Sequence, residues 1–131
     1  MALQNSKIIN ILLWLAQGIL ALLFLWLGYI KLATPAALPF PWTKEHPGLV
    51  LVTGIVDLLG GIGIILPAIL RLQPKLTIWA AYGILALMFI ASIFHVLRGE
   101  ANNIGFNIII LLIAVFIAWG RLKKAPIQPK I

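Results

Sequence analysis

Residues 48–70 read GLVLVTGIVDLLGGIGIILPAIL, an apolar run that a single charged residue, Asp57, interrupts. A run of this length can cross the hydrocarbon core of a bilayer, which needs about 20 mostly apolar residues in a helix. An ionisable side chain is costly in that setting and persists mainly where it faces a bundle interior or a water-filled cavity. The stretch therefore predicts a membrane-spanning helix with one buried polar site.

Three further apolar runs have the length of membrane spans. They cover residues 8–30, 76–97 and 104–120. Hydrophobic residues make up 63% of the chain and the mean hydropathy is +1.10, well above the composition of soluble domains. The fourth run is short, close to the lower limit of about 17 residues for a span. We expect an all-α transmembrane four-helix bundle that forms one domain over residues 1–131.

The basic residues indicate how the bundle is oriented. The net charge is +7, but the positive side chains stand at the ends of the apolar runs and form no stripe, so nucleic acid is not an expected partner. Four spans place both termini on one side, and the side richer in basic residues is cytoplasmic. We therefore expect both termini in the cytoplasm. We also expect the C-terminal tail, from Leu122 onward, to be solvated there. The terminal side holds Lys7, Arg71, Lys75, Arg121, Lys123, Lys124 and Lys130, and the other side holds Lys31, Lys44 and Arg98.

The segment between the first two spans, residues 31–47, is rich in proline. Proline at this density predicts a stiff, extended path without regular helix. Phe40 and Trp42 offer apolar contacts at the membrane interface. Two interpretations remain open: a lid over the outer mouth of the bundle, or an inert connector on the headgroups. The prolines are Pro35, Pro39, Pro41 and Pro47.

One face of the second span gathers small residues around its carboxylate. Gly54 and Gly60 lie three residues from Asp57, and Thr53 and Gly61 lie four residues from it. Residues at these spacings share a helical face, and small side chains let neighbouring helices approach closely. The face should point at other helices, and the carboxylate there needs a cation or hydrogen-bond donors.

Lys31 and His95 are the candidate partners of Asp57. Lys31 ends the first span one turn after Gly28, and His95 lies near the end of the third span on the same side. We predict that Asp57, His95 and Lys31 form a ligand-binding or proton-exchanging site on the outer side; the alternative for Lys31 is snorkelling to the interface. With His46 as the only other histidine and no cysteine, no metal site is expected. The supporting residues are Thr53, Gly54, Gly60, Gly61, Gly28, Ser92, Glu100, Asn103 and Asn107.

A series of short elements also follows a recognisable order along nearly the whole chain. The elements are Gly28-x-x-Lys31-Leu32, Pro35, Asp57-Leu-Leu-Gly60, Leu66-Pro67-Ala68, Arg71, Pro74, Leu76-Thr77, Phe94-His95, Arg98-Gly99-Glu100, Asn103 and Gly120-Arg121. In order and spacing they resemble the DoxX-like family of small four-span bacterial membrane proteins, in which glutamate is more common at the position of Asp57. The resemblance implies a protein of the bacterial inner (plasma) membrane, linked to thiosulfate:quinone oxidoreduction or to oxidative-stress complexes.

These observations favour a non-catalytic membrane subunit or anchor of a quinone-linked or oxidative-stress redox system. The chain has no electron carrier of its own, so no intrinsic cofactor is expected, and the expected ligand is a quinone or a lipid. The lipid bilayer and a redox partner protein are the expected surroundings. The alternative is a lipid- or small-molecule-binding assembly protein. A third interpretation is a small proton-coupled transporter, in which Asp57 changes its protonation between two faces of a homodimer.

Overall fold

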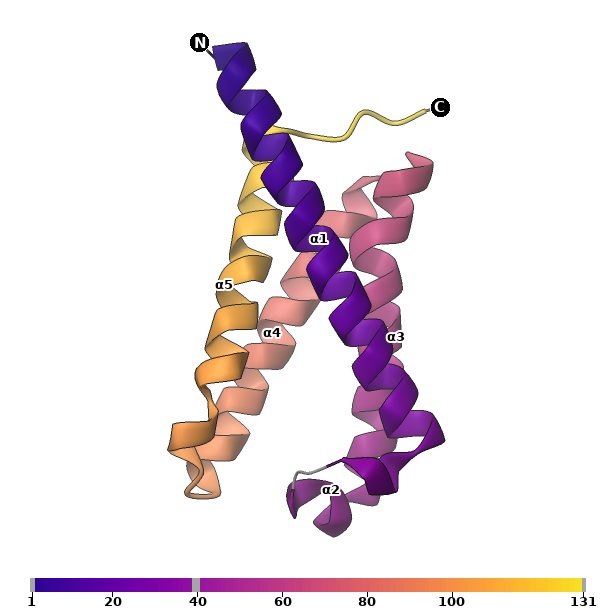
Figure 1. Cartoon of the computed structure of the whole chain (residues 1–131), viewed down its shortest axis with the longest axis vertical. Coiled ribbons are helices and arrows are strands. Elements are labelled where there is room, and N and C mark those ends of the chain that lie inside the picture. Colours follow the sequence, from indigo (N-terminus) through magenta and orange to yellow (C-terminus); the bar gives the residue numbers. More distant parts are fainter. Residues whose placement is uncertain (1, 39–40, 131) are drawn as a thin grey trace.

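The chain forms four long helices, and no strand occurs in the part of it that the structure describes. The computed structural model describes residues 2–38 and 41–130, without the side chains of residues 2–5 and of Asn103. Both termini lie at one end of the bundle (Figure 1), called here the terminal end. The opposite end, with the segments 34–38, 41–46 and 98–104, is called the loop end. The long helices are α1 (Ala2–Ala33), α3 (Pro47–Leu70), α4 (Lys75–Leu97) and α5 (Gly105–Trp119).

All four long helices have the length and composition of membrane spans, as the sequence predicts. The fourth is longer than expected, because α5 continues through a π-type turn over Gly120–Lys124 and its apolar stretch reaches Lys124. It is therefore long enough to cross a bilayer without residues from the preceding loop. The candidate spans are Ser6–Ala33, Pro47–Leu70, Lys75–Leu97 and Gly105–Lys124.

Large apolar side chains cover the outside of the bundle as well as its inside. Leu22 is 74% exposed, Trp79 66% and Leu112 60%, on three different helices. Soluble proteins rarely expose apolar patches this continuous. A bilayer removes that cost, since lipid tails contact these side chains in place of water.

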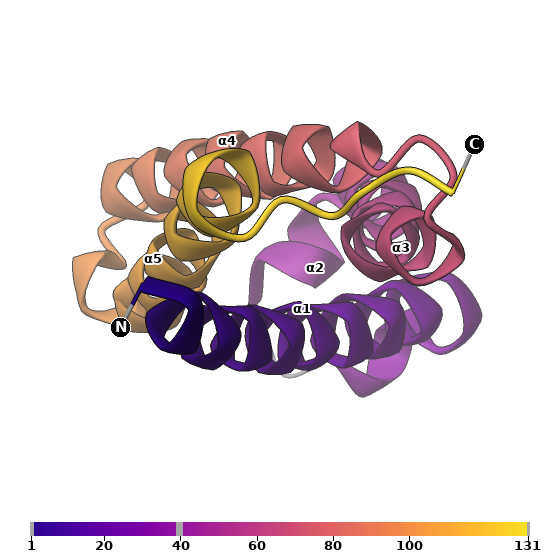
Figure 2. The same ribbon diagram turned by 90° about the horizontal axis from the view of Figure 1, so that it is seen from above.

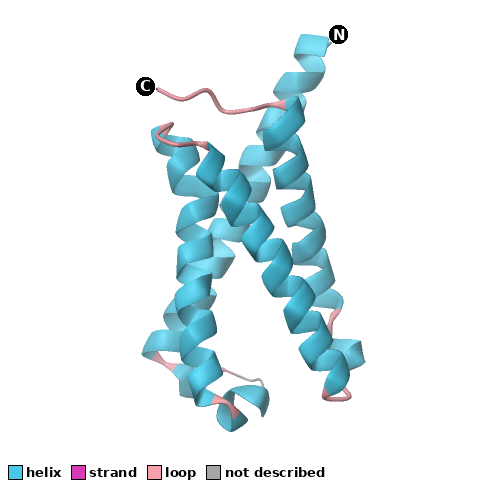
Figure 3. Ribbon diagram, turned by 180° about the vertical axis from the view of Figure 1, so that it is seen from behind, coloured by secondary structure: helices cyan, strands magenta, loops and turns pink. Residues whose placement is uncertain are grey.

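The helices pack as two pairs joined by a hairpin. α1 packs mainly on α3, α4 packs mainly on α5, and α3 is linked to α4 by a short turn at the terminal end. Seen from the terminal end, α1 and α4 form the two long sides of the bundle (Figure 2). The pairs diverge toward the loop end, where the short helix α2 (Pro41–Glu45) lies (Figure 3). The buried core comprises Leu20, Ala21, Phe24, Ile64, Ala81, Ile84, Met88, Ile110, Ala114, Ile117 and Ala118.

Glycines set the close approach of α1 and α3. A Cβ added at Gly28 would lie 2.9 Å from the backbone oxygen of Gly54, and one at Gly54 would lie 2.9 Å from the Cβ of Lys31. A Cβ at Gly61 would lie 3.2 Å from the backbone oxygen of Ala21. The small face predicted around Asp57 is therefore the surface on which α1 packs.

The proline-rich segment contains helix, so the expected extended path is wrong. Pro35 begins a 3₁₀ turn (η1, Pro35–Ala37), Pro41 begins α2, and Pro47 begins α3. Proline suits the first helical position because its missing N–H would have no intrahelical acceptor there. The prolines thus begin helices in this segment, although their number suggests from the sequence that no helix would form. Pro39 and Phe40 lie outside the described residues.

Candidate functional site

Lys31 and Asp57 form an ion pair inside the bundle near the loop end. The Nζ of Lys31 donates to Oδ2 of Asp57 over 2.7 Å, with the two side chains 12% and 3% exposed. Among the described residues, Lys31 is the one hydrogen-bond partner of this carboxylate. The approach of α1 to α3 at Gly28 and Gly54 places the end of α1 beside Asp57, so the pair follows directly from the glycine packing.

His95 is paired with Glu100, where the sequence suggested Asp57. Gly99 has a φ of 78° and turns the chain back after α4, so that the backbone N–H of Glu100 donates to the carbonyl oxygen of His95 over 2.8 Å. This turn brings Oε2 of Glu100 to 2.7 Å from Nδ1 of His95. Because an ionised carboxylate only accepts, Nδ1–H is the donor.

Arg98 connects this pair to α2. Its Nε donates to Oε1 of Glu100 over 3.1 Å, and its Nη1 donates to Oε2 of Glu45 over 2.6 Å. The hydrogen bond from His95 is the main reason that the pKa of Glu100 lies below its ordinary value, against the opposing effect of desolvation. The hydrogen bond from Arg98 likewise lowers the pKa of Glu45. Both carboxylates are thus held in the charged form.

Aromatic rings lie between the two polar clusters. The ammonium of Lys31 is 5.8 Å from the ring centre of Trp42, which packs edge-on against Phe94 at 6.1 Å. Phe94 also contacts the rings of His46 at 5.9 Å and His95 at 5.6 Å. Trp42 of α2 therefore joins the α1–α3 pair to the α4–α5 pair. The predicted site consists of two ion-paired clusters with an aromatic bridge between them.

The supporting residues have mainly packing roles in the structure. The hydroxyl of Thr53 donates to the carbonyl of Leu49 and that of Ser92 to the carbonyl of Met88, each within its own helix. Gly60 packs near Ile84, Asn107 is buried in the first turn of α5, and the side chain of Asn103 is outside the described part. Within the described residues, no three carboxylate or histidine side chains gather closely enough to hold a metal ion.

The loop-end network should loosen at acid pH. Because the pKa values of Glu45 and Glu100 are lowered in the folded protein, their stabilising effect is present above the ordinary carboxyl pKa of about 4.3 and is lost as the pH falls below it. Spin labels at Lys44 and Asn102 should show a narrow distance distribution at neutral pH that broadens below about pH 4. In Glu45→Gln the distance distribution should already be broad at neutral pH. If this variant instead keeps the narrow distribution at neutral pH and still broadens only in acid, the assignment is wrong.

A second buried polar cluster at the terminal end escaped the sequence analysis. Arg121 is 3% exposed; its Nε donates to Oε1 of Gln17 and its Nη1 to Oδ1 of Asn10, both over 2.7 Å. It also lies 5.0 Å from the ring centre of Trp14. The available signal was the spacing of Asn10, Trp14 and Gln17, which places all three on one face of α1. From the sequence, Arg121 is a topology signal and the last element of the family pattern, and neither use predicts its burial.

Gln17 should be important for stability because its side chain hydrogen-bonds to groups on two different segments at once, Ile64 in α3 and Arg121 after α5. Its Nε2 donates to the carbonyl of Ile64 over 2.7 Å while its Oε1 accepts from Arg121. Gln17→Leu should lower the free energy of unfolding by about 1–3 kcal/mol, since a carbonyl and a guanidinium both lose a buried partner. Unfolding in mixed micelles at increasing fractions of sodium dodecyl sulfate measures this. Gln128→Leu is the matched control, because that side chain is exposed and only its backbone oxygen is used. Equal stability of the two variants would contradict the role of Gln17.

Comparison with known proteins identifies the family. The sequence model of the DoxX-like family matches residues 15–117, well over half of the chain, and this range includes the Lys31–Asp57 and His95–Glu100 pairs. Comparisons with curated proteins and with solved structures find no match. The matched range covers most of all four long helices, and the chain belongs to the DoxX-like family.

Proposed function

We propose that the protein is a non-catalytic subunit, or anchor, of a quinone-linked redox system in the bacterial inner membrane. The observation that carries the proposal is the pairing of titratable side chains at the loop end, where Lys31–Asp57 and His95–Glu100 are both 2.7 Å pairs. Lys31, Asp57 and His95 lie in membrane spans, where titratable groups are costly and are characteristic of ligand or proton sites. Trp42 lies between the clusters and offers a ring on which a planar head group can stack.

The proposed chemistry is proton exchange with the quinone head group. Oxidation of a quinol releases two electrons and two protons. In the proposed scheme a partner oxidoreductase accepts the electrons, and the protons pass to side chains of this subunit. His95 is the proposed first acceptor because its Nδ1 is fixed by Glu100, which leaves Nε2 as the basic nitrogen. A histidine oriented in this way by a carboxylate can take up a released proton and pass it on, while the oxidation itself takes place on the partner.

Quinone that copurifies with the protein tests this function. The protein is extracted in mild detergent from membranes containing ubiquinone or menaquinone, and bound quinone is quantified by chromatography and mass spectrometry. His95→Gln and Asp57→Asn should both reduce bound quinone strongly. Lys44→Gln is the control, because Lys44 is exposed on α2 and leaves both pairs intact. The proposal is wrong if the amount of bound quinone is no higher than in an unrelated membrane protein purified in parallel. It is also wrong if all variants bind the same amount.

The second candidate is a lipid-binding protein, and a groove on the bundle favours it. The groove has a volume of about 230 Å³ and lies between α3 and α4, and Phe24 of α1 also lines it. Gly60 and Gly83 line it, and a Cβ at Gly83 would meet no atom within 4 Å. Its walls are otherwise apolar, which suits the acyl chain of a lipid.

Filling the groove distinguishes the two candidates. Gly83→Leu should expel a bound acyl chain without disturbing the loop-end pairs, and native mass spectrometry should then show less retained lipid. Gly18→Leu is the control, since a Cβ at Gly18 also meets nothing within 4 Å but lies outside the groove. Unchanged lipid in Gly83→Leu would exclude the lipid-binding function at this groove. Loss of quinone without loss of lipid in His95→Gln would favour the redox subunit.

A further inference from the structure

The distribution of charge leaves the terminal end without an acidic side chain. The chain has three acidic residues, and Glu45, Asp57 and Glu100 all lie at the loop end in the pairs described above. The basic side chains at the terminal end therefore have no carboxylate side chain available as a counter-ion. Most of them are exposed, where water and salt screen their charge.

Arg121 is the exception, because it is a buried cation with only neutral partners. Its acceptors are the side chains of Gln17 and Asn10 and the carbonyl oxygen of Ala125, the last at 2.8 Å from Nη1. Its Nη2 is buried and has no hydrogen-bond partner in the described part of the chain. Burial of an ionised group is costly unless an opposite charge compensates it. The site is thus short of one negative charge and one acceptor.

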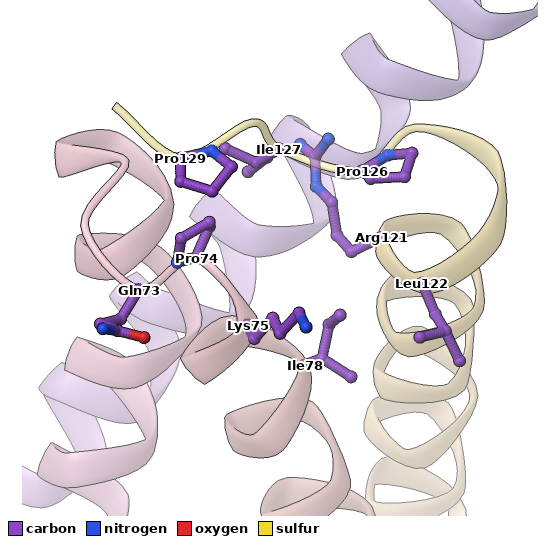
Figure 4. A pocket seen from close by; sticks show the side chains of 9 residues that line it. All are labelled: Gln73, Pro74, Lys75, Ile78, Arg121, Leu122, Pro126, Ile127 and Pro129. Atoms are coloured by element: carbon purple, nitrogen blue, oxygen red, sulfur yellow. The ribbon is translucent and has the colours of Figure 1, made fainter. Parts of the chain in front are cut away.

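A pocket lies directly beside this guanidinium. It has a volume of about 380 Å³ between the start of α4, the end of α5 and the C-terminal tail. Lys75 from α4 and Arg121 from the π-type turn after α5 are its two charged lining residues; in Figure 4 the side chain of Arg121 rises from above Lys75 toward the tail at Ile127 and Pro126. Ile78 and Leu122 contribute apolar walls below them. A cavity with two cations and apolar walls suits an amphiphilic anion.

The C-terminal tail forms the roof of this pocket and is held in place. It crosses the terminal end from α5 toward the α3–α4 turn (Figure 2); most of its side chains are exposed, as expected of a solvated tail, but its backbone is hydrogen-bonded to Arg71. Nε of Arg71 donates to the carbonyl of Gln128 over 2.9 Å, and the backbone N–H of Lys130 donates to the carbonyl of Arg71 over 2.8 Å. Pro126 and Pro129 lie in the roof, and both line the pocket.

We propose that this pocket binds a phosphate group, with Lys75 and Arg121 as its cationic ligands. A guanidinium matches the oxygens of a phosphate in paired hydrogen bonds, and a lysine adds a point charge. The phosphate sits beside Lys75 under the tail; a shift of the tail at Pro126 then opens Nη2 of Arg121 to a phosphate oxygen. The group belongs either to the head of an anionic phospholipid in the adjacent leaflet or to a soluble phosphate. Basic pockets between transmembrane helices bind lipid phosphates in this way.

Thermal stability of the purified full chain in a neutral detergent tests the proposal. Dioleoylphosphatidylglycerol is titrated against dioleoylglycerol, which has the same tails and no phosphate, and inorganic phosphate against chloride at equal ionic strength. Stabilisation by phosphatidylglycerol alone identifies a lipid source, and stabilisation by inorganic phosphate identifies a soluble one. If neither exceeds its control, the proposal is wrong.

Three variants make the test specific to the pocket. Lys75→Gln should weaken the phosphate effect about tenfold in apparent affinity, as the loss of one charge-assisted hydrogen bond predicts. Gln17→Glu should weaken it as well, because it gives Arg121 an internal carboxylate while keeping the basic residues intact; since this variant also loses the donor to the carbonyl of Ile64, its phosphate effect is measured against its own phosphate-free baseline. Lys123→Gln removes an exposed charge at the same end that does not line the pocket, and should change little. Equal weakening by Lys75→Gln and Lys123→Gln would show diffuse attraction and overturn the site.

Discussion

Lys31→Met lowers the free energy of unfolding by about 3–5 kcal/mol, the expected cost of leaving one partner of a buried ion pair uncompensated. Asp57 is 2% exposed and Lys31 is its one hydrogen-bond partner among the described residues, so the carboxylate left behind must protonate or draw water into the α1–α3 contact. Reversible unfolding in mixed micelles, followed by circular dichroism, measures the loss.

The double variant decides whether the pair itself is responsible. Lys31→Met combined with Asp57→Val removes both charges, and its stability should return to within about 1–2 kcal/mol of the original protein. Lys44→Met, which removes an exposed lysine, should change stability by less than about 0.5 kcal/mol. If the two single losses simply add in the double variant, Lys31 and Asp57 are not coupled.

Gly28→Ala should lower the free energy of unfolding more than the addition of a methyl group elsewhere in α1. Its Cβ would lie 2.7 Å from Cγ of Leu58 and 2.9 Å from the backbone oxygen of Gly54, and backbone cannot turn away as a side chain can. The two helices must separate, at a cost of about 1–3 kcal/mol for overpacking. The same unfolding assay measures the loss.

A matched control exists in the same helix. A Cβ at Gly18 meets nothing within 4 Å, so Gly18→Ala should be neutral or stabilising by up to about 1 kcal/mol, the difference in helix propensity between the two residues. A smaller loss for Gly28→Ala than for Gly18→Ala would mean that the close packing of α1 on α3 has been misjudged.

The sequence predicts the spans and the Lys31–Asp57 pair for simple reasons. Apolar runs bounded by charges locate transmembrane helices because the bilayer imposes a length on them. Asp57 is the one charge inside such a run, and Lys31 ends the neighbouring run on the same side of the membrane with Gly28 one turn before it. A buried acid, a nearby base and small residues between them leave few other arrangements.

The partner of His95 depends on geometry that spacing does not specify. Whether His95 meets Asp57 or Glu100 is decided by the left-handed turn at Gly99 and by the divergence of the two helix pairs toward the loop end. Arg121 was missed for a related reason. At the end of an apolar run it looks like any basic residue at the interface, and only the π-type turn at Gly120–Lys124 and the neighbouring α1 bury it.

The segregation of charge in the bundle also bears on how the protein crosses the membrane. Lys31, Lys44 and Arg98 share the loop end with all three acidic residues, so that end is electrically neutral and the net charge of +7 resides at the terminal end. A membrane potential does work of about 2.3 kcal/mol per elementary charge per 100 mV. In the orientation that the basic residues predict, with both termini in the cytoplasm, translocation of the loop end requires almost no electrical work, and depolarising the cell should leave insertion unimpaired.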